Sequence, residues 1–105
     1  MQSETRIGTR RILQNERLIK MRLNENFLTH EVEDEQIMID IKGKFQGIVT
    51  NNATAAFIVN CLKEETTFEE IVDKMFSEYD APREQIEKDV KQILEKLKAI
   101  NAIKI

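Results

Sequence analysis

The chain has 105 residues, of which 41% are hydrophobic and 33% are charged, and its formal net charge is −3. This length and composition are typical of one globular domain and exclude a disordered chain. The sequence has no apolar run of about 18 residues, no signal-peptide pattern and one cysteine, so we expect a cytoplasmic protein without a membrane span or an internal disulfide.

The charge is unevenly distributed along the chain. Residues 1–21 contain five basic and two acidic side chains, a net +3, which leaves −6 for residues 22–105. An acidic body disfavours nucleic-acid binding, which depends on neutralising phosphates. We therefore expect a protein or peptide partner.

Residues 1–20 are interpreted as an N-terminal extension to a domain of residues 21–105. The extension is Arg-rich, and residues 9–20 have the pattern of a short amphipathic helix, which alone is marginal in water. It could be a disordered tail, a segment docked on its own domain or on a second copy, or a fusion.

Three segments that precede residue 51 are predicted to be strands. Residues 27–32 and 36–41 alternate between two faces, which is typical of strands with one buried face. In the second segment, one face carries Ile37, Ile39 and Ile41, and the other carries Gln36, Met38 and Asp40. Residues 45–50 form the third predicted strand, in which Gly47 indicates a bulge or the close approach of another backbone.

Three helices are predicted to follow the strands. The first begins at the N-cap residue Asn52, and the second begins at Thr66 or Thr67, either of which fits a capping box. The third has Pro82 in its first turn and ends near Asn101. The apolar stripe of the second helix is formed by Phe68, Ile71, Val72, Met75, Phe76 and Tyr79. Residues 102–105 are predicted to be a short strand or an extended tail.

The sequence lacks a recognisable catalytic or metal-binding pattern. His30 and Cys61 are its only histidine and cysteine, whereas a zinc site needs about four clustered ligands. We expect Cys61 to be a core thiol and His30 to have a structural or surface role. Acidic pairs such as Glu69 and Glu70 fall at helix starts, where they complement the helix dipole. The sequence therefore predicts a protein that is not an enzyme and has no cofactor or metal.

Several motifs occur in an order typical of a known family. Residues 51–62 read NNATAAFIVNCL, residues 67–71 read TFEEI, a Tyr79-Asp80 pair follows, and residues 89–97 read DVKQILEKL. Together they resemble the PqqD-like family, the peptide chaperones also called RiPP recognition elements, over roughly residues 22–105. The chain departs from the family pattern where Asn51 replaces a leucine, Val59 a tryptophan, and Asn101-Ala102 a Gly-Leu pair.

The resemblance implies an α+β, winged-helix-like fold with a three-stranded antiparallel sheet followed by three α-helices. It also implies a non-catalytic protein that binds the leader segment of a ribosomally made precursor peptide. The module then presents this peptide to a modifying enzyme, often a radical SAM enzyme.

The resemblance places the peptide along the third strand, residues 45–50, with the third helix as the second wall of a groove, and strand addition is the binding mode that fits this placement. Depending on the register of the strand, either Ile48 and Thr50 or Phe45 and Val49 face the groove. The expected peptide-binding residues are Phe45, Gln46, Ile48, Val49, Thr50, Ile86, Asp89, Val90 and Ile93.

Asp89 would suit a basic leader residue, whereas the three helix residues Ile86, Val90 and Ile93 fit the core equally well. The basic residues 1–20 could occupy the same acidic groove, in their own chain or in a homodimer.

The sequence is also compatible with two other functions. A winged helix can bind DNA, but residues 82–100 contain five basic and four acidic side chains and so form no basic stripe. A scaffold or dimerisation module without a peptide ligand is the second alternative.

Overall fold

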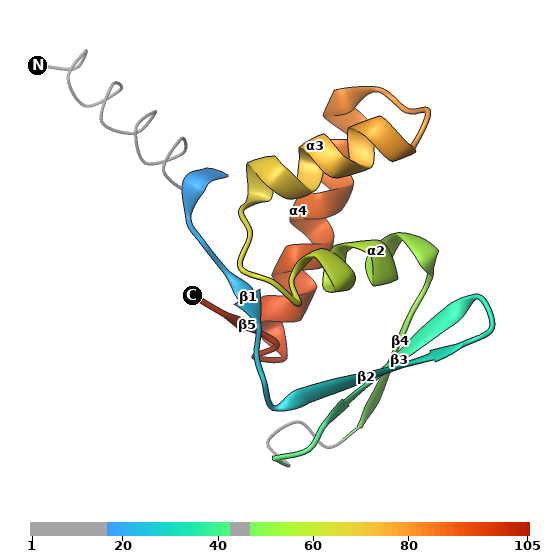
Figure 1. Ribbon diagram of the computed structural model, residues 1–105, viewed down its shortest axis with the longest axis vertical. Coiled ribbons are helices and arrows are strands. Elements are labelled where there is room, and N and C mark those ends of the chain that lie inside the picture. Colours follow the sequence, from blue (N-terminus) through green and yellow to red (C-terminus); the bar gives the residue numbers. More distant parts are fainter. Residues whose placement is uncertain (1–16, 43–46) are drawn as a thin grey trace, which may run out of the picture.

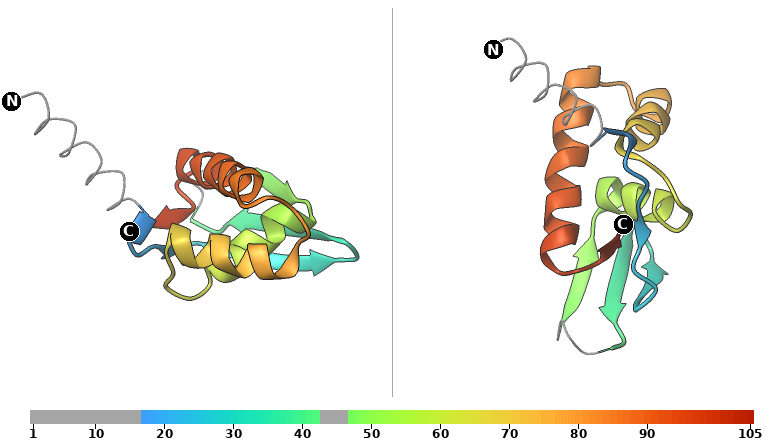
Figure 2. Two further views of the ribbon diagram at one scale, coloured as in Figure 1. Left: turned by 90° about the horizontal axis from the view of Figure 1, so that it is seen from above. Right: turned by 90° about the vertical axis from the view of Figure 1, so that its left-hand side faces the viewer.

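The computed structural model describes residues 17–42 and 47–105. Strands β2 (Phe27–Val32), β3 (Glu35–Asp40) and β4 (Ile48–Asn51) form an antiparallel sheet in that order. Helices α2 (Ala53–Cys61), α3 (Phe68–Glu78) and α4 (Arg83–Ala99) follow, and they lie on one side of the sheet (Figures 1 and 2). The predicted α+β fold is therefore confirmed, although the second strand lies one residue earlier than expected and the third begins at Ile48.

The helix starts agree with the caps that the sequence predicts. The side-chain oxygen of Asn52 accepts a hydrogen bond from the Ala55 N–H at 2.9 Å. Thr67, rather than Thr66, caps α3, because its hydroxyl oxygen accepts from the Glu70 N–H at 3.1 Å. Pro82 is the N-cap of α4, one residue before the helix. Asn101 has a φ of 62° just after the helix, a conformation that commonly ends helices.

A second, smaller pair of strands joins the two ends of the domain. Strand β1 (Arg22–Leu23), which the sequence analysis missed, pairs with β5 (Ile103–Lys104). Met21 exchanges two backbone hydrogen bonds with Thr66, each of 2.8 Å. The chain that leads into the sheet is therefore fastened to both the α2–α3 loop and the C-terminal segment.

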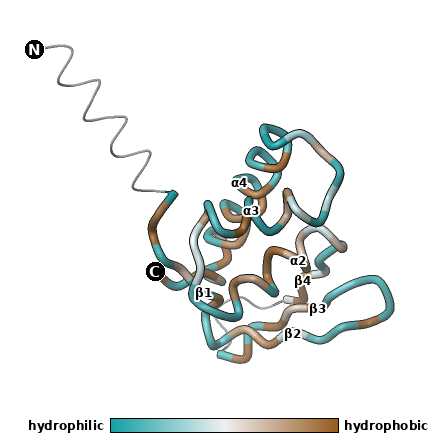
Figure 3. Tube along the Cα trace, turned by 45° about the horizontal axis from the view of Figure 1, so that its top comes forward, coloured by the Kyte–Doolittle hydropathy of each residue, from teal (hydrophilic) through white to brown (hydrophobic). Residues whose placement is uncertain are grey.

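The core lies between the sheet and the helices. The apolar helix α2 is central to it (Figure 3), and Ile58, Val59 and Leu62 are completely buried. Two residues of the predicted stripe of α3 are not part of this core. Phe76 is 48% exposed and Tyr79 is 37% exposed, because the end of α3 extends past the core. Their rings contact the Arg83 guanidinium and the Phe57 ring instead.

The buried face of β3 is the one that carries Gln36 and Met38, both with 0% exposure, and not the isoleucine face. Ile39 lies on the face away from the helices, directly between its cross-strand partners Leu28 and Ile48. These three side chains are exposed because the described helices cover only one side of the sheet. Alternation could not identify the buried face, since both faces of β3 carry apolar residues.

Candidate functional site

Strand β4 is an edge of the three-stranded sheet. Among the described residues it pairs only with β3. In an antiparallel ladder, the backbone groups of alternate residues point away from the partner strand. The four residues of β4 therefore present about four N–H and C=O groups that an incoming strand can bind.

The register of β4 determines which of its side chains face the helices. Val49 pairs with the buried Met38 and is packed against the core. Ile48 and Thr50 point to the opposite, exposed face of the sheet. Of the two registers that the sequence left open, the structure has the one in which Val49 faces the helices. Phe45 and Gln46 lie outside the described residues.

A buried polar network fixes β4 to its neighbours. The side-chain N–H of Asn51 donates to Gln36 Oε1 at 2.9 Å. Gln36 Nε2 in turn donates to Glu31 Oε1 and to Asn60 Oδ1, both at 3.0 Å. The network thereby links β4, β3 and α2. The sequence analysis did not predict this network. The signal for it was Asn51, a polar residue at a position where the family has a leucine.

Helix α4 presents two different flanks to its surroundings. Ile86 and Val90 are 2% and 0% exposed, so they belong to the core rather than to an accessible surface. Asp89 and Ile93, four residues apart, are partly exposed on one flank. The Asp89 carboxylate accepts a hydrogen bond from Gln85 Nε2 at 2.9 Å, which orients it along this flank.

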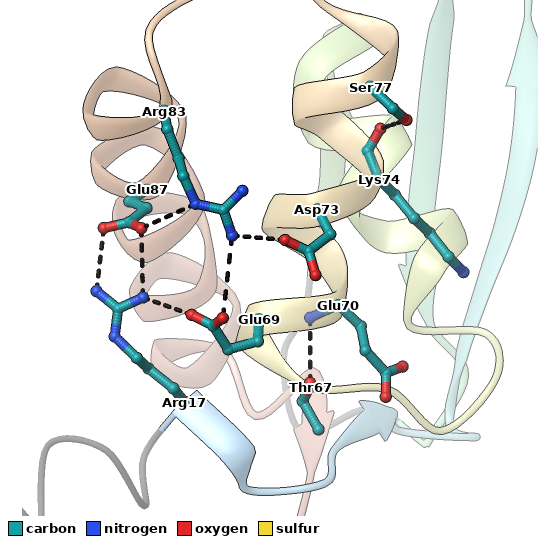
Figure 4. Close-up of polar contacts among 9 residues, drawn as sticks. All are labelled: Arg17, Thr67, Glu69, Glu70, Asp73, Lys74, Ser77, Arg83 and Glu87. Atoms are coloured by element: carbon teal, nitrogen blue, oxygen red, sulfur yellow. Dashed lines mark hydrogen bonds and ion pairs between the residues drawn. The ribbon is translucent and has the colours of Figure 1, made fainter.

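The other flank of α4 holds a network of ion pairs with the N-terminal segment (Figure 4). Arg17 binds Glu69 at 2.6 Å and Glu87 at 3.0 Å, and Arg83 bridges Glu69, Glu87 and Asp73. Arg17 therefore contacts the flank of Glu87 and not the flank of Asp89. The rest of the proposed self-docking segment, residues 1–16, lies outside the described residues.

The ion pairs change the acidity of their members. The hydrogen bond from Arg17 is the main reason why the pKa of Glu87 lies below its usual range. Hydrogen bonds to Glu87 and Glu69 raise the pKa of Arg17, and the hydrogen bond to Asp73 raises that of Arg83. Arg17, Arg83 and Glu87 are consequently charged near neutral pH, and their ion pairs hold Arg17 against α3 and α4.

Cys61, predicted to be a core thiol, packs against the core without being completely buried, and His30 has the surface position that was one of its two predicted roles. Cys61 is half-buried, and burial raises the pKa of its thiol, which makes it a weak nucleophile. His30 is exposed on the outer face of the sheet, opposite Ile37. Within the described part of the chain, no group of three His, Cys, Asp or Glu side chains is placed to hold a metal ion.

The site can therefore bind an extended peptide through backbone pairing. Of the predicted peptide-binding residues that the structure describes, Val49 on β4 and Asp89 and Ile93 on α4 are partly exposed. Their contact with a peptide stays a prediction. Among the described residues, none of the helices has the length and apolar character that crossing a membrane requires.

Two solved structures have a similar fold. One is described as TbiB1 in complex with the TbiA(beta) leader peptide; it is 22% identical, with a TM-score of 0.71 over 79% of this chain and 94% of that one. The other is a lasso peptide synthetase B1 complexed with the leader peptide; it is 21% identical, with a TM-score of 0.69 over 81% of this chain and 98% of that one. No curated protein matches the sequence.

A family model supports the assignment from the sequence. The model for coenzyme PQQ synthesis protein D (PqqD) matches residues 31–103. This range contains β3, β4 and all three described helices, so it includes both elements of the candidate site. The chain therefore belongs to the PqqD family.

Proposed function

We propose that this protein is a non-catalytic peptide chaperone that binds the leader segment of a ribosomally synthesised precursor peptide. The leader adds as a strand to the free edge of β4 and is presented to a modifying enzyme. The observation that carries this proposal is the open edge of β4, which lies on a sheet whose helix-facing side is closed by the core. Membership of the PqqD family supports it, as do two similar folds whose descriptions name a bound leader peptide.

Backbone pairing supplies affinity with little selectivity. About four hydrogen bonds, each with a net contribution of roughly 0.5–1.5 kcal/mol, would hold the leader. Selectivity between leader peptides then depends on the side chains of Val49, Ile93 and Asp89. Asp89 favours a basic leader residue. We infer that the modifying enzyme is a radical SAM enzyme; the family resemblance is the support for this step.

Proline substitutions on the two edge strands test the proposal. Of Ile48 and Val49, one directs its N–H toward the free edge, because successive residues point to opposite neighbours. Ile48→Pro and Val49→Pro are therefore made separately, and Thr29→Pro on the other edge strand, β2, is the control. The Ile41 N–H bonds Asn26 directly opposite it, so alternation turns the Thr29 N–H away from β3. The leader encoded beside the gene is titrated into each variant by calorimetry, after circular dichroism has established which variants are folded.

We expect the β4 variant that keeps the fold to bind the leader about ten-fold or more weakly, which corresponds to one lost backbone interaction and a steric clash. Thr29→Pro should bind as the parent does. A folded β4 variant with undiminished affinity would rule out strand addition at this edge.

A further inference from the structure

A cavity lies on the flank of α4 that faces away from Asp89. Its volume is about 370 Å³, whereas a cavity of about 150 Å³ is sufficient for a benzene ring. Of residues 17–42 and 47–105, five apolar ones from four parts of the chain line it: Ile19, Met21, Phe68, Leu94 and Ile105. Met21 and Leu94 are each 5% exposed and form the apolar floor. The cavity has room for one or two bulky side chains of a ligand.

The charged lining of this cavity is mainly cationic. Lys91 and Lys98 lie seven residues apart, two turns along the same flank of α4, and Glu95 is the only acidic residue in the described part of the lining. Among the described residues, neither lysine forms an ion pair. Lys98 is in the last turn of the helix, where a cation also complements the dipole, but Lys91 is mid-helix and has no such role.

Arg17 also belongs to the cationic lining, but unlike the two lysines it is not available to pair with a ligand. Its guanidinium lies 5.2 Å from the centre of the Phe68 ring and is already bound to Glu69 and Glu87. It therefore closes the wall of the cavity next to Phe68. The two lysines are left as the charges that an incoming ligand can neutralise.

We propose that this cavity is a second docking site, which takes a short acidic segment of a partner protein. A bulky apolar side chain of the segment enters the cavity above Met21 and Leu94, and flanking carboxylates pair with Lys91 and Lys98. The site is separate from the edge of β4, because none of the described residues that line the cavity belongs to β4. A leader peptide and an acidic partner segment can therefore be bound at the same time. Binding of the acidic segment at this cavity does not require a bound leader.

Peptide titrations of the full-length protein test this site. The probe is the acetylated and amidated peptide Asp-Asp-Phe-Leu-Asp-Asp, and the control peptide has lysine in place of each aspartate. Chemical shifts of the ¹⁵N-labelled chain and of its methionine methyl groups report the location of binding. We expect the acidic probe to shift the signals of Met21 and Leu94, and the lysine peptide to leave them in place.

Charge variants then separate the cavity from non-specific attraction. The double variant Lys91→Glu/Lys98→Glu should bind the acidic probe about ten-fold more weakly than the parent. The double variant Lys91→Gln/Lys98→Gln keeps good helix formers in place. Its affinity for the acidic probe should lie between that of the parent and that of the double glutamate variant. Lys96→Glu is the matched control, because this exposed residue is on the other flank of the same helix; its affinity should change less than two-fold.

Three results would overturn the proposal. Shifts centred on β4 or Ile93 would place the acidic probe at the strand edge instead. Equal binding of the lysine peptide would remove the role of the two lysines. An equal loss of affinity in Lys96→Glu would reduce the effect to the overall charge of the protein.

Discussion

Asn51 and Gln36 lie directly opposite each other in the β3–β4 ladder, and their buried side chains share a hydrogen bond of 2.9 Å. This bond holds the end of the candidate binding strand in register. In Asn51→Leu, the variant that restores the residue typical of the family, Gln36 Oε1 loses its donor. A buried polar group without a partner costs about 1–3 kcal/mol. Urea denaturation should show a loss of stability of this size.

The double variant Gln36→Leu/Asn51→Leu is the control for this interpretation. It replaces both partners with apolar side chains, so no buried amide of the pair is left without a partner. We expect the double variant to be more stable than the sum of the two single effects predicts, with a coupling energy of about 1 kcal/mol or more. Strictly additive losses would mean that the two amides do not act as a pair.

The ion pairs of Arg17 predict a stability that depends on pH. Arg17 holds the pKa of Glu87 below its usual range. The contribution of this ion pair to the free energy of unfolding is therefore fully present above the unfolded carboxyl pKa of about 4.3. The contribution is lost as the pH falls through the lowered pKa of the folded state. At pH 7, Arg17→Ala should lose about 1 kcal/mol, since the side chains concerned are partly exposed and screened by solvent. The gap between parent and variant should close in acid.

Lys20 supplies the comparison for Arg17. It comes from the same segment, but its pair with Glu65 has an N–O distance of 3.9 Å between two well-exposed side chains. Lys20→Ala should therefore change the free energy of unfolding by less than about 0.5 kcal/mol at any pH. A gap between Arg17→Ala and the parent that stays constant from pH 7 into acid would show that the effect comes from packing rather than from charge.

The sequence predicted the elements of the fold well because its local signals are strong. Asn52 and Thr67 are capping residues that act through short side-chain bonds to their own helices, so neighbours in the sequence are sufficient to identify them. The third strand was expected to carry the binding edge because of the family resemblance. Strand β1 was missed because two residues carry no periodicity, and its partner β5 lies about 80 residues further along the chain.

The side-chain environment of the site was harder to predict than its backbone. Ile86 and Ile93 belong to the same apolar stripe, yet Ile86 is buried and Ile93 is partly exposed, because the edge of a stripe depends on what packs beside it. The Asn51–Gln36 bond depends on strand register, which composition does not specify. The contacts of Arg17 with Glu69 and Glu87 join residues more than 50 positions apart, so no local pattern could reveal them.

Asp89 provides a prediction for leader selectivity that rests on the proposed function. Asp89→Lys reverses the charge on the flank of α4 beside Ile93, and we expect it to weaken binding of a leader with a basic residue at that point by about ten-fold. Glu84→Lys makes the same charge change at an exposed position on the far side of the helix. Calorimetry at low and at moderate salt should show a loss for Asp89→Lys only. Equal losses in both variants would indicate a general charge effect and no contact with Asp89.

The two faces of β3 provide the last prediction. Met38 is completely buried and Ile39, its neighbour, is 42% exposed. Met38→Ala should therefore cost about 2–5 kcal/mol, because it removes buried atoms and leaves a cavity. Ile39→Ala removes a partly exposed side chain on the face that the described helices leave uncovered, beside Leu28 and Ile48, so its cost should be below about 1 kcal/mol. Urea denaturation of both variants gives the comparison. A larger loss for Ile39→Ala in the isolated protein would mean that a second copy covers the isoleucine face, and its dependence on protein concentration would then identify that contact.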